Sequence, residues 1–230
     1  MSPIDREDST EVAWSLVAPE GSLTTTGDDA VLVLRLGQSV NAIRAAQRFY
    51  LYAARESGMA ASRDQLIAFL TGVGWVVEAL IGLRRRPADL ARVCDLARAD
   101  GSPNRDIERL TAMLETDNAL MTKLARVRDK LTFHWDRGPA LSWVQARDSG
   151  EVLWAQGVGD RNGDLLWRAS SDVVANQIEP PEPGETREQS EERAKQFIQD
   201  FIPVMTLVVG VFEHAIRSFL HEQGATLRER

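Results

Sequence analysis

An uninterrupted apolar stretch in the first half of the chain restricts the fold more than any other feature. Eighteen mostly apolar residues run from Leu66 to Leu83, and three arginines, at 84–86, follow at once. A membrane-spanning helix needs about 20 apolar residues, and Glu78 would lie near the middle of such a span, where an ionisable side chain is costly. The stretch therefore predicts a buried core helix in a helical bundle and no membrane segment.

Apolar residues at a spacing of three to four continue the helical pattern along most of the chain. In the first predicted helix, which Thr26 or Asp28 would cap, they include Leu32 and Leu36. Pro87 separates two helices, because proline fits a first helical turn but disfavours a helical residue before it. The predicted helices cover about 28–57, 63–85, 87–98, 105–135, 172–178 and 187–230, with a bend at Pro203.

The hydrophobic period changes between residues 140 and 170. Three short runs, each with one tryptophan, are separated by polar turns, and the pair Asn162–Gly163 is a strong hairpin signal. A linker over 179–186, with three prolines in eight residues, comes before the last helix. We therefore expect a mainly α protein in which residues 1–230 form one helical domain with a small inserted antiparallel β-meander.

The charge distribution limits the surface that an anionic partner can use. The chain carries 27 basic and 34 acidic residues, a net charge of −7, whereas proteins that coat nucleic acid are usually basic. The segment from Lys123 to Arg137 differs, because five basic and two acidic residues give it 5 − 2 = +3. We expect an anionic partner to bind at this segment.

Composition also bears on the compartment and on metals. The single Cys94 excludes a disulfide framework and a Cys-rich metal site. The first residues are acidic and lack the basic region and apolar core of a secretory signal. The polar turn at 160–164 lacks the glycine and the closing glutamate of a calcium loop, and His214 and His221 do not form a zinc-binding pattern. We expect a cytoplasmic protein without a bound metal.

Within the basic segment, Arg128, Asp129 and His134 combine side chains suited to phosphate chemistry. Arginine offers a permanent fork of donors for phosphate, and histidine exchanges a proton near neutral pH. Their order, an arginine, a polar residue and a histidine after a gap of five, resembles the motif of the HEPN superfamily, whose domains are all-helical. The surrounding residues RDKLTFHWD also resemble a motif of HEPN-like bacterial proteins.

This resemblance implies an activity and a role for each motif residue. Catalytic HEPN proteins are metal-independent endoribonucleases, often toxins or defence effectors, and commonly act as dimers. Arg128 would hold the scissile phosphate, and His134 would move a proton while the ribose 2′-OH attacks. Asp129 would orient one of these two side chains. No cofactor is implied.

Six further residues would assist this site. The cations Lys130, Arg126 and Arg137 are expected to bind RNA. Supporting residues are expected from earlier helices, and the candidates are Glu78, Asn41 and Arg44.

Helix geometry adds a condition. On a regular helix, residues six apart point about 120° away from each other and are separated by about 9 Å along the axis. Arg128 and His134 would therefore meet around one phosphate only if the helix end loosens or a second subunit supplies one of them. We accordingly expect a homodimer.

Structural interpretations of the same residues stay open. His134 at a helix end can cap the last carbonyls, and Glu78 can form an ion pair with Arg44 or with an arginine of 84–86. A hydrogen bond between helices explains Asn41 and Arg44 equally well. The alternative function is a non-catalytic HEPN-like module that binds RNA, a nucleotide or a partner protein such as an antitoxin. The third hypothesis is a purely structural helical dimer in which the motif is coincidental.

Overall fold

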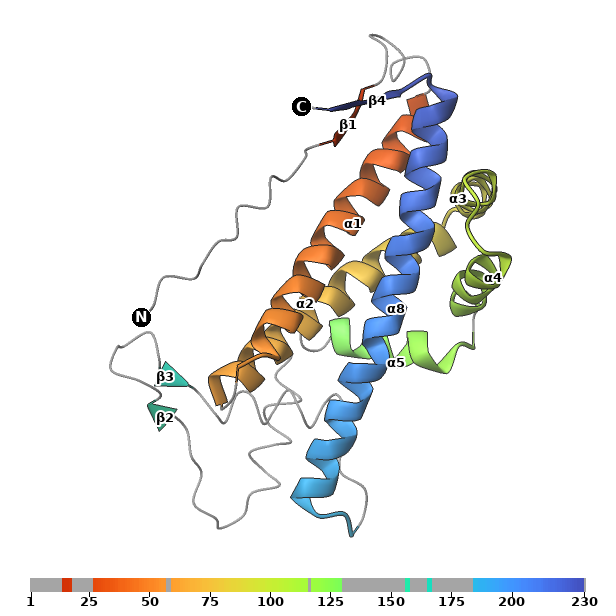
Figure 1. Cartoon of the computed structure of the whole chain (residues 1–230). Helices are drawn as coiled ribbons and strands as arrows, with labels where there is room; N and C mark the ends of the chain where they lie inside the picture. The colour runs from red at the N-terminus through yellow and green to blue at the C-terminus, as the bar shows by residue number, and fades with distance from the viewer. Residues whose placement is uncertain are drawn as a thin grey trace.

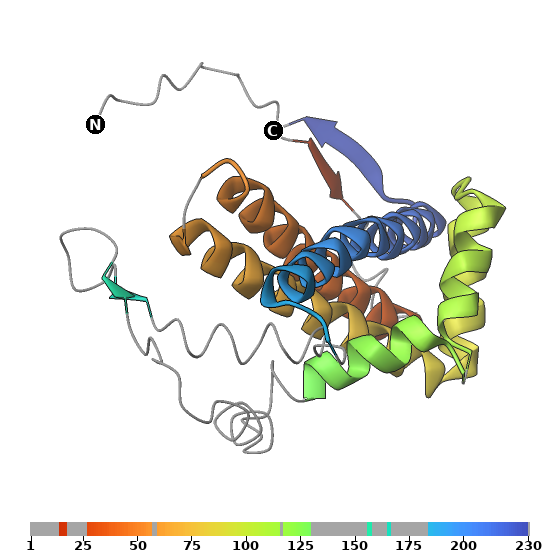
Figure 2. The ribbon, with the colours of Figure 1, turned by 90° about the horizontal axis from the view of Figure 1, so that it is seen from below.

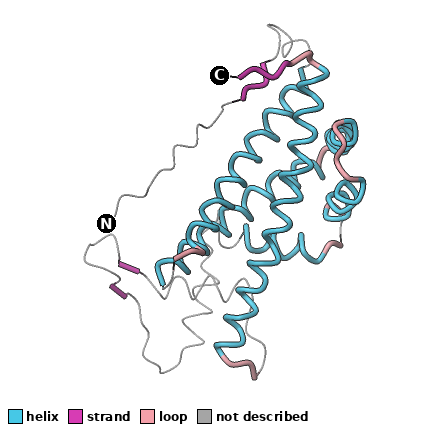
Figure 3. Tube along the Cα trace, viewed as in Figure 1, coloured by secondary structure: helices cyan, strands magenta, loops and turns pink. Residues whose placement is uncertain are grey.

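The computed structural model describes residues 14–17, 27–56, 59–115, 117–129, 156–157, 165–166 and 184–229. These residues are mostly helical, which confirms the predicted mainly α class (Figure 3). The helices are α1 (Gly27–Ala53), α2 (Met59–Arg84), α3 (Pro87–Ala99), α4 (Asn104–Met113), α5 (Ala119–Val127) and α8 (Arg187–Glu222). The strands are β1 (Trp14–Val17), β2 (Gln156–Gly157), β3 (Leu165–Leu166) and β4 (Thr226–Glu229).

Three long helices, α1, α2 and α8, lie side by side and enclose the core (Figures 1 and 2). The apolar stretch that opens the sequence forms most of α2, and its residues Val73, Val76 and Leu80 are fully buried. The facing sides of α1 and α8 contribute Ile43 and Phe212, which are equally buried. Burial of such side chains is the main favourable term in folding, so α2 contributes a large part of the core.

A cluster of phenylalanine rings joins α2 to α8. The ring of Phe69 meets those of Phe197 and Phe201 edge to face, with centroids 5.9 Å and 5.4 Å apart. One turn further along α2, a Cβ atom on Gly72 would lie only 2.5 Å from Sδ of Met205. The absence of a side chain at Gly72 therefore lets the two helices approach closely.

The shorter helices cover one side of this bundle, where α3 and α4 pack against α8 and α5 packs against α2. Pro87 stands in the first turn of α3, as predicted. Arg92 of α3 joins three helices, because its Nε lies 2.9 Å from Asp29 of α1 and its Nη2 lies 2.6 Å from Glu222 of α8.

The two ends of the described chain meet in a β-ribbon. β1 pairs antiparallel with β4, with Trp14 opposite Glu229 and Val17 opposite Thr226 (Figure 1). The prediction that the last helix continues to the C-terminus is therefore wrong. α8 ends at Glu222, and Gly224 takes a φ of 72°, a left-handed conformation that glycine adopts without steric cost.

The prediction of one helix over 105–135 is also wrong. Two helices, α4 and α5, occupy its first part, and the side chain of Asn118 caps the second by accepting a hydrogen bond from the backbone N–H of Met121. Asn118 also donates to the carbonyl of Ala112, 3.1 Å away, which fixes the turn between the helices. The apolar spacing is the same in both helices, so periodicity alone does not reveal the break.

The other helix ends differ less from prediction. α1 ends at Ala53, before the expected 57, and α2 begins at Met59, before the expected 63. α8 begins at the end of the predicted linker with a capping box between Thr186 and Gln189, and it runs through Pro203. The predicted helix over 172–178 and residues 179–183 of that linker lie outside the described residues.

Only part of the predicted β-meander over 140–170 can be compared with the structure. β2 pairs antiparallel with β3, with Gln156 opposite Leu166. The turn between these strands, the predicted first strand and the three tryptophans lie outside the described residues.

Two described helical segments, Arg63–Arg84 and Glu192–Glu222, are long and apolar enough to cross a membrane by length and composition alone. The bundle buries 50% and 56% of their most apolar windows. Core helices of soluble bundles have the same character, so these segments are weak support for a membrane location.

Candidate functional site

The end of α5 brings Arg128 against α2. Three buried residues at every third position, Met121, Leu124 and Val127, hold α5 in place, and α5 packs on α2. The next residue is Arg128, the C-cap of the helix. Its side chain thus reaches α2 because the apolar face of α5 is anchored there.

The guanidinium of Arg128 forms ion pairs with two carboxylates. Nη2 pairs with Oε1 of Glu78 on α2, and Nη1 donates to Oδ1 of the neighbouring Asp129. The side chain of Arg128 is 23% exposed, whereas those of Glu78 and Asp129 are 45% and 51% exposed. One positive charge therefore faces two negative charges at a half-open surface.

Glu78 is thus the partner of Arg128. The structural interpretation of the sequence, which paired Glu78 with Arg44 or with an arginine of 84–86, is wrong. The carboxylate is half exposed, so it does not incur the cost expected of a charge buried in an apolar helix. Its side chain also lines a small cavity of about 130 Å³ between α1 and α2, together with Arg35 and Trp75.

Asn41 and Arg44, the other two predicted supporting residues, lie elsewhere. Both line a groove between α1 and α8, and Nη2 of Arg44 lies 2.5 Å from Oε1 of Glu213. The structure therefore places only Glu78, of the three, in contact with Arg128.

The regular helix assumed for the motif ends before Arg128. α5 ends at Val127, and Arg128 and Asp129 form a wider helical turn. The regular helix that the sequence predicts for the motif therefore does not continue through Arg128 and Asp129. His134, Lys130 and Arg137 lie outside the described residues.

In the described part of the basic segment, Arg128 and Lys123 both make contacts within the fold. Nζ of Lys123 lies 3.8 Å from the centroid of the Phe197 ring, a cation–π contact that ties α5 to α8. Arg126, a predicted RNA-binding residue, is exposed. The surface available to an anion there is smaller than the count of five basic residues indicates.

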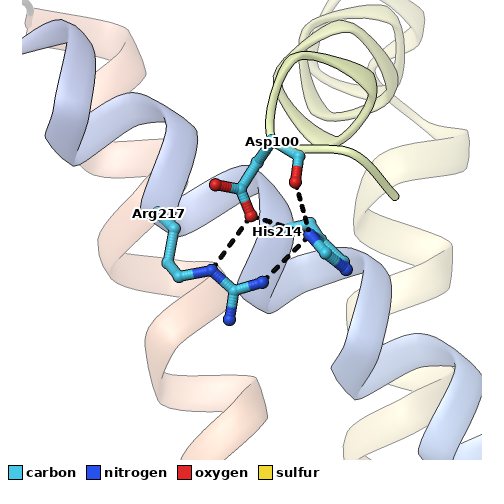
Figure 4. Close-up of polar contacts among 3 residues, drawn as sticks. All are labelled: Asp100, His214 and Arg217. Carbon is cyan, nitrogen blue, oxygen red and sulfur yellow. Dashed lines mark hydrogen bonds and ion pairs between the residues drawn. The ribbon is translucent and has the colours of Figure 1, made fainter. Parts of the chain in front are cut away.

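Sequence reasoning missed a second polar cluster, formed by Asp100, His214 and Arg217 (Figure 4). Nδ1 of His214 lies 2.7 Å from Oδ2 of Asp100 and 3.2 Å from its carbonyl oxygen. Nη2 of Arg217, a donor, also lies 2.9 Å from the same Nδ1, so the tautomer of the ring decides whether Nδ1 donates to Asp100 or accepts from Arg217. Nε of Arg217 donates to the same Oδ2 at 2.9 Å.

This cluster fastens the end of α3 to α8. Asp100 is the C-cap of α3, and its two partners lie three residues apart on one face of α8. The spacing of His214 and Arg217 is visible in the sequence, but only the fold reveals that the end of α3 reaches them.

The electrostatics of the cluster stabilise the charged form of Asp100. Partial burial opposes ionisation, but hydrogen bonds from His214 and Arg217 and the charges of these partners outweigh it, so the pKa of Asp100 lies below its ordinary value of 3.8. A carboxyl whose pKa is lower in the folded than in the unfolded state stabilises the fold above the unfolded pKa. This stabilisation is lost as the pH falls through the folded pKa.

We expect Asp100→Asn to lower the free energy of unfolding by about 1–2 kcal/mol at pH 7, because the charged hydrogen bonds to α8 are weakened. The difference from wild type should be constant above pH 5 or so and shrink as the pH falls below 3.8. Urea unfolding at several pH values measures it. The control is Asp95→Asn, whose carboxylate is 69% exposed and should contribute less than about 0.5 kcal/mol. An equal decrease in the free energy of unfolding in both variants would show that the Asp100 cluster does not contribute specifically to stability.

Within the described ranges, no group of three or more histidine, cysteine, aspartate or glutamate side chains is arranged to hold a metal ion. The described side chains at Arg128 are one guanidinium and two carboxylates, and a guanidinium is a donor suited to an anion.

No family model matches the chain, and no curated protein or solved structure is significantly similar to it.

Proposed function

We propose that the protein is a metal-independent endoribonuclease of HEPN type that acts in the cytoplasm, as a toxin or defence effector. The observation that carries this proposal is the ion pair of Arg128 with Glu78. The resemblance implies that an acidic residue from an earlier helix supports the motif, and Glu78 of α2 is in the position for this role.

In this mechanism Arg128 binds the scissile phosphate and stabilises its developing negative charge. Glu78 acts as a positioning residue that fixes the plane of the guanidinium. Asp129 is the more exposed of the two carboxylates, and the incoming phosphate would take its place on Arg128. Both carboxylates lower the positive potential at the site, so we expect weak RNA affinity.

The bond changes are those of an internal phosphoryl transfer. The ribose 2′-oxygen attacks the adjacent phosphorus and passes its proton to solvent water, while the bond from phosphorus to the 5′-oxygen breaks. His134 supplies a proton to that leaving oxygen. The products are a 2′,3′-cyclic phosphate and a 5′-hydroxyl, and no metal or cofactor takes part.

A homodimer belongs to the same proposal. Catalytic HEPN proteins commonly bring two motifs together, and the second subunit would supply further basic side chains to the RNA. Since α5 ends at Val127, the spacing of a regular helix does not by itself keep Arg128 and His134 of one subunit apart.

The second candidate is a non-catalytic HEPN-like module that binds RNA, a nucleotide or a partner protein. One observation favours it: two carboxylates already engage Arg128. In this function the ion pair with Glu78 only fastens α5 to α2.

Incubation of the full chain with total RNA and with tRNA, each with and without EDTA, separates the two candidates. The proposed enzyme cleaves RNA equally well in EDTA, because Arg128 and His134 need no metal. RNA binding without cleavage supports the module and contradicts the enzyme. Cleavage that EDTA abolishes also contradicts the proposed mechanism.

A further inference from the structure

A groove between α1 and α8 lies apart from Arg128 and has features of a ligand site. Its volume is about 700 Å³, within the range of small-molecule pockets. Polar side chains of α1 form one wall, and Ile202, Val209 and Gly210 of α8 contribute apolar surface.

Two pairs of side chains brace the groove across its width. Arg44 forms its ion pair with Glu213, and Nε2 of Gln47 donates to Oγ1 of Thr206 at 3.1 Å. These pairs satisfy one another and leave the wall preorganised. They also join α1 to α8, so the groove is a fixed part of the bundle.

Arg48 carries the one positive charge of the groove that these pairs do not neutralise. It lies one turn beyond Arg44 on the same wall, it is exposed, and it has no ion pair within the part of the chain that the structure describes. Arg44 and Glu213 cancel, so the groove carries a net charge of about +1 from Arg48. This charge favours an anionic ligand.

Gly210 makes room for a ligand on the opposite wall. A glycine inside a helix costs about 0.5–1 kcal/mol relative to alanine. A Cβ atom on Gly210 would have no other atom within 4 Å, so close packing of the chain does not require glycine at this position. Its missing side chain instead widens the groove beside Val209.

We propose that this groove binds a small amphipathic anion: an acidic group, such as a carboxylate, held by Arg48, and an aliphatic body on Ile202, Val209 and Gly210. The proposal is independent of the RNA cleavage assigned to Arg128. The charge selects the acidic group, and the apolar floor selects the body, so neither inorganic phosphate nor a neutral alcohol should match it.

Isothermal titration of the full chain with decanoate, decanol and inorganic phosphate tests the ligand class. Decanoate should bind saturably at one site per chain and at least about tenfold more tightly than decanol or phosphate, which corresponds to one charged hydrogen-bonded contact. Equal binding of decanol, or no saturable binding of decanoate, overturns the proposal.

Two variants locate the site. Gly210→Leu should weaken decanoate binding at least about tenfold by filling the groove from a position where a Cβ atom has open space, and Arg48→Gln should do so by removing the charge. The matched control is Gly37→Leu, since a Cβ atom on Gly37 of α1 also meets nothing within 4 Å and Gly37 does not line the groove. Unchanged affinity in Gly210→Leu, or an equal loss in Gly37→Leu, places decanoate elsewhere and refutes the site.

Discussion

Replacing Arg128 by alanine should reduce the rate of RNA cleavage at least about 100-fold, the loss typical of removing one donor that stabilises a transition-state charge. The guanidinium donates charged hydrogen bonds to the phosphate once the phosphate takes the place of Asp129 on Nη1. The free energy of unfolding should change by less than about 1 kcal/mol, because both partner carboxylates are about half exposed and remain hydrated. Single-turnover cleavage in EDTA measures the rate, and urea unfolding followed by circular dichroism measures the free energy of unfolding of each variant.

Two variants control this result. Arg128→Lys keeps the charge but not the fork, and it should recover only a small part of the rate. Arg105→Ala makes the same change in net charge at a side chain that is 81% exposed on α4, and it should cleave like the wild type. Cleavage by Arg128→Ala at the wild-type rate would remove Arg128 from the mechanism.

Replacing Phe69 by alanine should lower the free energy of unfolding by about 3–5 kcal/mol. The side chain is 1% exposed and is packed between the rings of Phe197 and Phe201, so its removal leaves a cavity between α2 and α8. For a chain of this length the melting temperature should fall by about 6–20 °C, at about 2–4 °C per kcal/mol. Thermal and urea unfolding measure the change.

The control for this cavity is Phe49→Ala on α1. Phe49 is 41% exposed, so its loss removes little buried surface and should cost less than about 1 kcal/mol. If both variants have the same melting temperature, the junction of α2 and α8 is not the core of the fold.

The helical class could be predicted from the sequence because the apolar spacing is regular in α1, α2, α3 and α8. The break between α4 and α5 could not, since Asn118 interrupts the backbone without interrupting the spacing. The pairing of β1 with β4 also escaped prediction, because strands more than 200 residues apart leave no local pattern that joins them.

The candidate site could be predicted only in part, because contacts between residues far apart in the sequence leave no local pattern. Arg128 and Asp129 are neighbours in the sequence, and Glu78 was singled out as a lone acid in an apolar helix, but its contact with Arg128 depends on how α5 docks on α2. Asn41 and Arg44 lie three residues apart on one face of α1, but this face lines the groove between α1 and α8 and does not reach Arg128. The Asp100 cluster combines two helices in a way that neither helix indicates alone.

The most direct test of the proposed function is the formation of 2′,3′-cyclic phosphate ends on a defined RNA in EDTA, measured for the wild type and for His134→Ala at equal concentration. We expect cyclic phosphate and 5′-hydroxyl ends from the wild type and a rate at least about 100-fold lower for His134→Ala, since the leaving oxygen loses its proton donor. Wild-type protein that binds the RNA without producing these ends, or equal rates for the two proteins, would contradict it.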